Sequence, residues 1–159
     1  MKYFRKDLWE AINSLDFEES ERAENEWRLN DRYYWSEYQK LNTRLQKEIF
    51  EFFQTTDFHD CKVNECKITQ GQLRSAYPTN LYIEVEREGE EWIIEYRKIV
   101  HLNINFPEVT SSAHNGFEEW GYDELLPVND HLLSHEILFS SGSTILVHFF
   151  DKEISITKK

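Results

Sequence analysis

The sequence predicts an α+β fold in which N-terminal helices, one of them long, pack on one face of a mostly antiparallel C-terminal β-sheet. Two observations support this prediction. Apolar residues recur at helical spacing in the first third of the chain, and the period changes to two after Thr55 and Thr56. A chain of 159 residues fits a single domain, with a helical part at 1–54 and a sheet part at 58–157. Aromatic residues make up 15% of it, which excludes a disordered chain.

Two helices are expected before the sheet part. A short helix over about residues 5–15 is predicted by the spacing of Leu8, Trp9, Ile12 and Leu15. Residues 16–20 then break or bend the helical pattern. A second helix of about 30 residues follows, with one apolar stripe that is typical of a face buried in a core. This stripe consists of Trp27, Tyr34, Tyr38, Leu41, Leu45, Ile49 and Phe52.

Strands are expected from residue 58 onward. Residues 58–70 form the first candidate, and alternation around Ile83 predicts a half-buried strand. Apolar residues of one parity between Trp92 and Phe106 predict one long strand, or two strands joined at a bulge near Lys98. A hairpin turns at residues 140–143, and a last short strand contains Ile154 and Ile156.

The segment 107–131 shows no clean period. It contains two prolines and two glycines, Pro107, Gly116, Gly121 and Pro127. A structureless loop of this length is uncommon in a compact domain and is often functional. The alternative is a set of short strands or turns that the periodicity does not resolve.

The charge of the chain is strongly one-sided. Its net charge of −12 argues against nucleic acid and anionic membranes as partners. No Lys or Arg occurs between Lys98 and Lys152, a window that holds five of the six histidines and many acids. Such a window predicts a negative surface potential that speeds encounter with a basic protein. The alternative is that the acidity serves solubility alone.

Acids alternate with aromatic residues inside this window. Protein interfaces favour aromatic anchors with charged groups at the rim, so this cluster is the candidate partner-binding face. It consists of Glu118, Glu119, Trp120, Tyr122, Asp123 and Glu124. The alternative is that Trp120 and Tyr122 are core residues flanked by solvated acids, because large aromatic side chains are usually mostly buried.

No catalytic residue, metal ligand or cofactor is expected. His131 and His135 are four apart, but the segment runs into a strand, where four residues span about 13 Å, too far for one metal. Asp57, His59 and Asp60 are interpreted as surface polar residues, and the two cysteines as reduced structural thiols. No stretch approaches about 18 consecutive apolar residues and the N-terminus lacks the apolar region of a secretion signal, so a cytoplasmic protein without a membrane span is expected.

Two stretches resemble a family of small proteins of Gram-positive bacteria with no assigned activity. One is Met1–Phe4 with Trp9, and the other is 120–124 followed by 134–143. The resemblance implies no catalytic residues. In general character the chain is similar to immunity proteins of bacterial toxin systems.

Three functions are therefore considered. The first is an acidic, cytosolic protein-binding module, such as an immunity or inhibitor protein that neutralises a basic toxin or nuclease. The second is a small-ligand-binding protein or enzyme with a pocket between helix and sheet that involves His135 and Glu136. The third is a structural or regulatory subunit.

Overall fold

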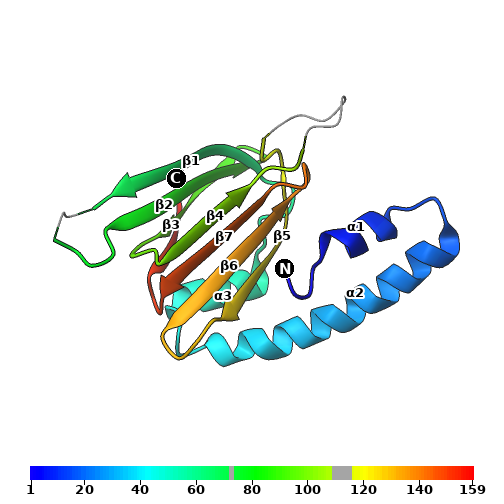
Figure 1. Ribbon diagram of the computed structural model, residues 1–159, viewed down its shortest axis with the longest axis horizontal. Helices are drawn as coiled ribbons and strands as arrows, with labels where there is room; N and C mark the ends of the chain where they lie inside the picture. Colours follow the sequence, from blue (N-terminus) through cyan, green and yellow to red (C-terminus); the bar gives the residue numbers. More distant parts are fainter. Residues whose placement is uncertain (72–73, 109–115) are drawn as a thin grey trace.

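A computed structural model describes residues 1–71, 74–108 and 116–159, and it confirms the α+β class (Figure 1). Helical elements come first along the chain: α1 (Lys6–Ile12), α2 (Phe17–Tyr38), the short 3-10 helix η1 (Gln39–Leu41) and α3 (Lys47–Thr55). The strands follow: β1 (Lys62–Gln70), β2 (Thr79–Arg87), β3 (Glu90–Tyr96), β4 (His101–Asn105), β5 (Trp120–Pro127), β6 (Leu132–Phe139), β7 (Thr144–Phe150) and β8 (Ile154–Lys158). None of the described helices is long and apolar enough to cross a membrane.

The strands form two sheets. The first sheet has the order β1-β2-β3-β8 and the second has the order β4-β7-β6-β5, and every pairing described is antiparallel. The residues between Trp92 and Phe106 supply two strands, β3 and β4, which belong to different sheets. The change occurs at Lys98, whose φ of 52° turns the chain out of the first sheet. The N–H of Val100 then donates to the carbonyl of His148 in the second sheet.

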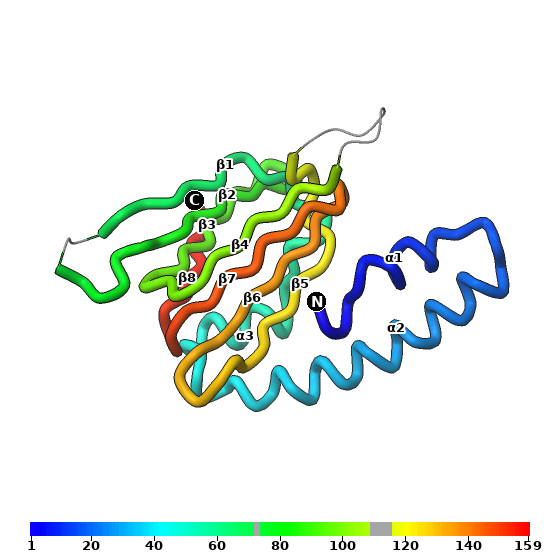
Figure 2. The backbone as a smooth tube through the Cα atoms, in the orientation of Figure 1, coloured from blue at the N-terminus to red at the C-terminus, as the bar shows by residue number. Residues whose placement is uncertain are grey.

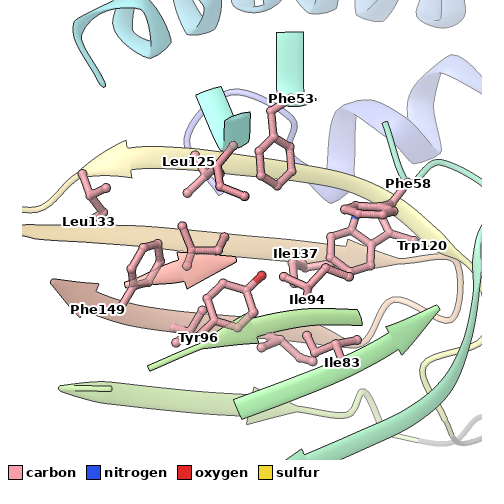
Figure 3. Close-up of a cluster of buried hydrophobic side chains, with 14 of the residues drawn as sticks. Phe53, Phe58, Ile83, Ile94, Tyr96, Trp120, Leu125, Leu133, Ile137 and Phe149 are labelled. Atoms are coloured by element: carbon pink, nitrogen blue, oxygen red, sulfur yellow. The ribbon is translucent and has the colours of Figure 1, made fainter. Parts of the chain in front are cut away.

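The core lies between the two sheets, and α3 closes one side of it. Alternate side chains of β2, β3 and β7 are buried, as expected for sheets with one buried face. Figure 3 shows side chains from both sheets meeting there: Ile83, Ile94 and Tyr96 from the first, and Trp120, Leu125, Leu133, Ile137 and Phe149 from the second, with Phe53 and Phe58.

The predicted long helix is divided into α2, η1 and α3. Its apolar stripe runs through the division, because Tyr38, Leu41 and Leu45 are all buried. The carbonyl of Arg44, which would accept from within a continuous helix, accepts instead from the N–H of Lys152 at 2.9 Å. The stripe continues to the buried Ile49 in α3, but the next buried residue is Phe53, whereas the predicted Phe52 is half-buried.

The unassigned segment 107–131 contains strand β5. Residues 109–115 of that segment lie outside the described part of the chain. β5 is an edge strand of the second sheet, with an irregularity in its pairing to β6 between Trp120 and Tyr122. This irregularity removes the period of two that would have identified a strand.

Helix α2 covers the open edge of β5. The Leu125 N–H, which has no strand partner on that side, donates to the Tyr34 hydroxyl at 3.2 Å. Covering an edge in this way prevents it from pairing with another chain. Helices α1 and α2 lie side by side, and both extend beyond the sheets, as the backbone trace in Figure 2 shows.

Candidate functional site

A pocket of about 510 Å³ opens between α2 and the start of β5. The end of α3 and the segment after it form another side, and Phe4 and Arg87 complete the wall. Its lining residues are Phe4, Trp27, Asp31, Tyr34, Trp35, Phe53, Thr56, Asp57, His59, Arg87, Gly121, Tyr122 and Asp123. The volume lies in the range of pockets that take small organic molecules, about 300–1,000 Å³.

One face of α2 supplies a third of this lining. Trp27, Asp31 and Trp35 follow each other at intervals of four, so the helix places them on one side. The Trp35 indole Nε1–H donates to Asp31 Oδ1 at 3.0 Å. This bond holds the indole and the carboxylate in a fixed relation along the helix surface.

The N-terminal segment and β5 supply aromatic rings that contact those of α2. The ring centroid of Phe4 lies 5.2 Å from that of Trp27 and 5.1 Å from that of Tyr34. Tyr122 lies 4.6 Å from Trp27, edge to face. The rings therefore support one another and form a continuous aromatic surface rather than separate contacts.

Asp123 links the pocket to a buried polar chain. Its Oδ2 accepts from the Trp120 indole Nε1–H at 2.9 Å, and its Oδ1 lies 3.0 Å from His135 Nε2, off the line of a straight hydrogen bond. On the other side of the imidazole, Nδ1 lies 2.7 Å from the Tyr96 hydroxyl. Tyr96 and His135 are fully buried, whereas Asp123 is 14% exposed. Asp123 is thus the member of this chain that faces the pocket.

The rim of the pocket carries both signs of charge. Arg87 donates to the carbonyl of His59 at 2.6 Å and lies 3.4 Å from Asp57 Oδ1. His59 Nδ1–H donates to the carbonyl of Gly121 at 2.6 Å, which ties the segment before β1 to β5. These bonds fix the rim in place while the Arg87 side chain stays 37% exposed.

The negative charge at the pocket affects its tyrosines. Burial raises the pKa of the Tyr34 hydroxyl well above its usual value, and the charge of Asp123 raises it further. Burial, followed by the charges of Asp60 and Asp57, raises the pKa of Tyr122. Both hydroxyls therefore stay protonated across the physiological pH range and act as neutral hydrogen-bonding groups.

The structure separates the six predicted partner-binding residues. Trp120 is 1% exposed and packs against Phe58 and Phe139 in the core, so it cannot anchor a partner docked on the folded surface. Glu124 is also 1% exposed and is a structural carboxylate. The core interpretation of Trp120 is correct, and its interpretation as a surface anchor is wrong.

The other four lie in two different places. Tyr122 and Asp123 line the pocket, whereas Glu118 and Glu119 are exposed before β5 begins.

The burial of Glu124 is explained by its hydrogen bonds. The N–H groups of Lys2, Tyr3 and Phe4 donate to the Glu124 carboxylate at 2.8, 2.6 and 2.6 Å.

Two acids of the window between Lys98 and Lys152 are paired with cations from elsewhere in the chain. Asp151 pairs with Arg44 at 2.7 Å, and Glu136 Oε2 lies 2.7 Å from the Met1 amine. Glu136 and His135 are neighbours on one strand and point to opposite faces, so they do not share a site. His131 is exposed just before β6, apart from the buried His135.

The chemistry of the remaining candidates is structural. Cys61 is buried and Cys66 is half-buried, and both are free thiols. Within residues 1–71, 74–108 and 116–159, no group of three or more His, Cys, Asp or Glu side chains is arranged to hold a metal ion.

Sequence reasoning missed most of the pocket. Trp27 was assigned to a core stripe, and Asp57 and His59 to the open surface. The signal that could have identified the helix side is the spacing of Trp27, Asp31 and Trp35, because an acid between two tryptophans on one helix face is unusual for a core.

No protein-family model matches the chain. A comparison with curated proteins finds no significant match.

Proposed function

We propose that this chain is a binding protein that takes a small organic ligand in the pocket between α2 and β5. One observation supports this proposal above others: an aromatic-lined pocket of about 510 Å³ into which a few polar side chains converge. Pockets of this size and composition are the usual form of small-molecule sites. The proposal corresponds to the second of the three functions considered from the sequence, with Asp123 in place of Glu136.

The way the pocket is built also favours ligand binding. Its walls come from α2, α3, β5 and the N-terminal segment, and they are fixed by hydrogen bonds such as Trp35 to Asp31 and His59 to Gly121. A site that is already formed loses little conformational freedom when it binds. The fixed walls therefore suit recognition of one ligand shape.

The test is a screen of small organic molecules by thermal shift, followed by calorimetry on the hits. The pocket variant is Trp35→Leu, which removes an aromatic wall. The matched control is Tyr33→Leu on the same helix, because Tyr33 is exposed and does not line the pocket. A true pocket ligand binds Tyr33→Leu like the parent protein and binds Trp35→Leu at least tenfold more weakly. Hits that bind both variants equally, or no hits at all, would contradict the proposed function.

A basic protein partner is the second candidate. Glu118 and Glu119 are exposed, and they come from the window without Lys or Arg. An immunity-type role in the cytoplasm depends on such a partner. The test is a pull-down followed by association rates for Glu118→Gln/Glu119→Gln, which should fall by roughly tenfold or less if these charges steer the encounter. An unchanged rate would show that this surface is not used.

A further inference from the structure

The α2 and β5 side of the pocket carries two carboxylates, Asp31 and Asp123, that pair with no described lysine or arginine. Asp31 accepts a hydrogen bond from a neutral donor, the Trp35 indole. Among the described residues, no ammonium or guanidinium lies within ion-pair distance of Asp31. Asp123, whose side chain is 14% exposed, accepts from the Trp120 indole and also lies 3.0 Å from His135 Nε2. Two carboxylates therefore face a confined space that is otherwise lined mainly by aromatic rings.

The one guanidinium of the pocket does not neutralise this inner charge. Arg87 lies at the rim, where it contacts Asp57 and the carbonyl of His59. Because its charge is engaged there and remains partly solvated, a negative region persists on the α2 and β5 side. Because Asp31 and Asp123 are partly buried, their charges act more strongly on a ligand than the same charges at an open surface would.

The aromatic lining favours the same class of ligand. Trp27, Trp35 and Tyr122 are only partly buried, so their rings can contact a bound molecule. Aromatic faces attract cations and repel anions, with tryptophan the strongest, and this attraction grows as water is excluded. Aromatic walls combined with carboxylates form the standard chemistry for recognising alkylated ammonium groups.

We infer that the ligand of this pocket is an organic cation, with an ammonium or alkylammonium head directed toward Asp31 and Asp123 and an apolar body against the aromatic wall. This inference rests on the proposed function and adds the chemical class of the ligand. An anionic ligand would face two carboxylates, and a neutral ligand would leave them without a counter-charge.

The experiment uses two sets of molecules that differ in charge and little in shape. One set is choline, 3,3-dimethyl-1-butanol and 3,3-dimethylbutanoate. The other is tyramine, 4-hydroxyphenylethanol and 4-hydroxyphenylacetate. Calorimetry on the full chain should give, in at least one set, a cation affinity at least tenfold above that of the neutral molecule, with the carboxylate weakest. Nα-acetyl-lysine methylamide is added to distinguish a free cation from the side chain of a partner protein.

Charge variants test whether the preference for cations depends on the pocket carboxylates. Asp31→Asn keeps an oxygen that can accept from the Trp35 indole and should weaken cation binding about tenfold. Glu21→Gln is the matched control, because it removes one negative charge from an exposed position of the same helix outside the pocket. Arg87→Gln should act in the opposite direction and tighten cation binding several-fold.

The outcomes separate the two proposals. Preference for cations that Asp31→Asn reduces and Glu21→Gln does not supports the inference, and preference for the lysine derivative assigns the cation to a partner protein. If Trp35-dependent ligands from the screen are neutral or anionic, and the cations bind no better than their partners in each set, the inference is wrong while the binding function stands. If no molecule binds in a Trp35-dependent way, the proposed function fails and the inference fails with it.

Discussion

Phe4 and Glu124 lie 120 positions apart and are joined by a 2.6 Å hydrogen bond from the Phe4 backbone N–H to Glu124 Oε1. The same oxygen accepts from the N–H of Tyr3, and Oε2 accepts from that of Lys2. The carboxylate thereby holds the N-terminal segment on β5 and positions the Phe4 ring in the pocket wall.

Glu124→Gln should destabilise the fold. The substitution removes the charge that three N–H groups share and places an amide nitrogen, itself a donor, against one of them. Hydrogen bonds to charged groups contribute about 1.5–3 kcal/mol each, so a loss of roughly 2–3 kcal/mol in the free energy of unfolding is expected. Urea unfolding measures it, with Glu119→Gln as an exposed control on the same segment. Equal stability of the two variants would show that the carboxylate does not hold the N-terminus.

Gly121→Ala should also destabilise the protein. A Cβ at this position would lie 2.7 Å from Trp9 Cη2 and 2.8 Å from the carbonyl oxygen of Leu138. Because the second neighbour is backbone, it cannot rotate away, and overpacking of this kind costs about 1–3 kcal/mol. Gly116→Ala is the control, since no atom of residues 1–71, 74–108 or 118–159 lies within 4 Å of the added atom there. A stable Gly121→Ala protein would mean that α1 packs less closely on β5 than described.

Leu45→Ala tests the apolar stripe that crosses the division between η1 and α3. Leu45 is 2% exposed, so its truncation should lower the free energy of unfolding by about 2–5 kcal/mol. The control is Leu29→Ala on α2, which is exposed and should change stability by less than about 0.5 kcal/mol. A change of that small size for Leu45→Ala would place the stripe outside the core.

The thiol of Cys61 should react slowly in the folded protein. Burial raises its pKa to about 11, so at pH 8 only about one thiol in a thousand is the reactive thiolate. The Cys66→Ser variant isolates Cys61, and labelling by a disulfide reagent at pH 8 is compared with and without 6 M guanidinium as an unfolding agent. We expect labelling to be at least a hundredfold faster after unfolding. Equal rates would mean that Cys61 is accessible and ionised in the native state.

The strands with strict alternation could be predicted because their pattern is local. Ile83 with its neighbours at i±2, and Ile145 with Val147, each lie on a strand with one buried face, as the period indicated. The division of the strands between two sheets could not be predicted in this way. It depends on a single residue, Lys98, that adopts a positive φ, and on a hydrogen bond from Val100 to the distant β7.

Most of the candidate site could not be predicted from the sequence, for a related reason. Glu124 looked like a surface acid because its partners are backbone groups at the other end of the chain. Trp120 lies next to the irregular pairing in β5, so the alternation that would have marked it as inward-facing was lost. Trp27 fitted the apolar stripe of a helix, and periodicity alone does not distinguish a pocket wall from a core.

Glu153 should make stability depend on pH in the acidic range. Its carboxylate is 19% exposed and lies 2.6 Å from Lys98 Nζ and 3.2 Å from Arg97 Nε. Burial acts to raise the pKa of Glu153, but the hydrogen bonds and charges of Lys98 and Arg97 outweigh it, and the pKa is lowered in the folded protein.

The sign of the effect follows from this lowered pKa. The unfolded chain binds a proton at Glu153 more readily than the folded chain does, so the contribution is complete above the unfolded pKa of about 4.3 and is lost as the pH falls through the lower folded value. Because both cations are partly exposed, the contribution is about 0.5–1 kcal/mol. Urea unfolding of Glu153→Gln should therefore show that deficit at pH 7 and nearly none at pH 2.5, whereas Glu21→Gln, an exposed acid on α2 beyond its first turn, should match the parent protein at both. A deficit for Glu153→Gln that is unchanged at pH 2.5 would show that the carboxylate acts by packing rather than by its charge.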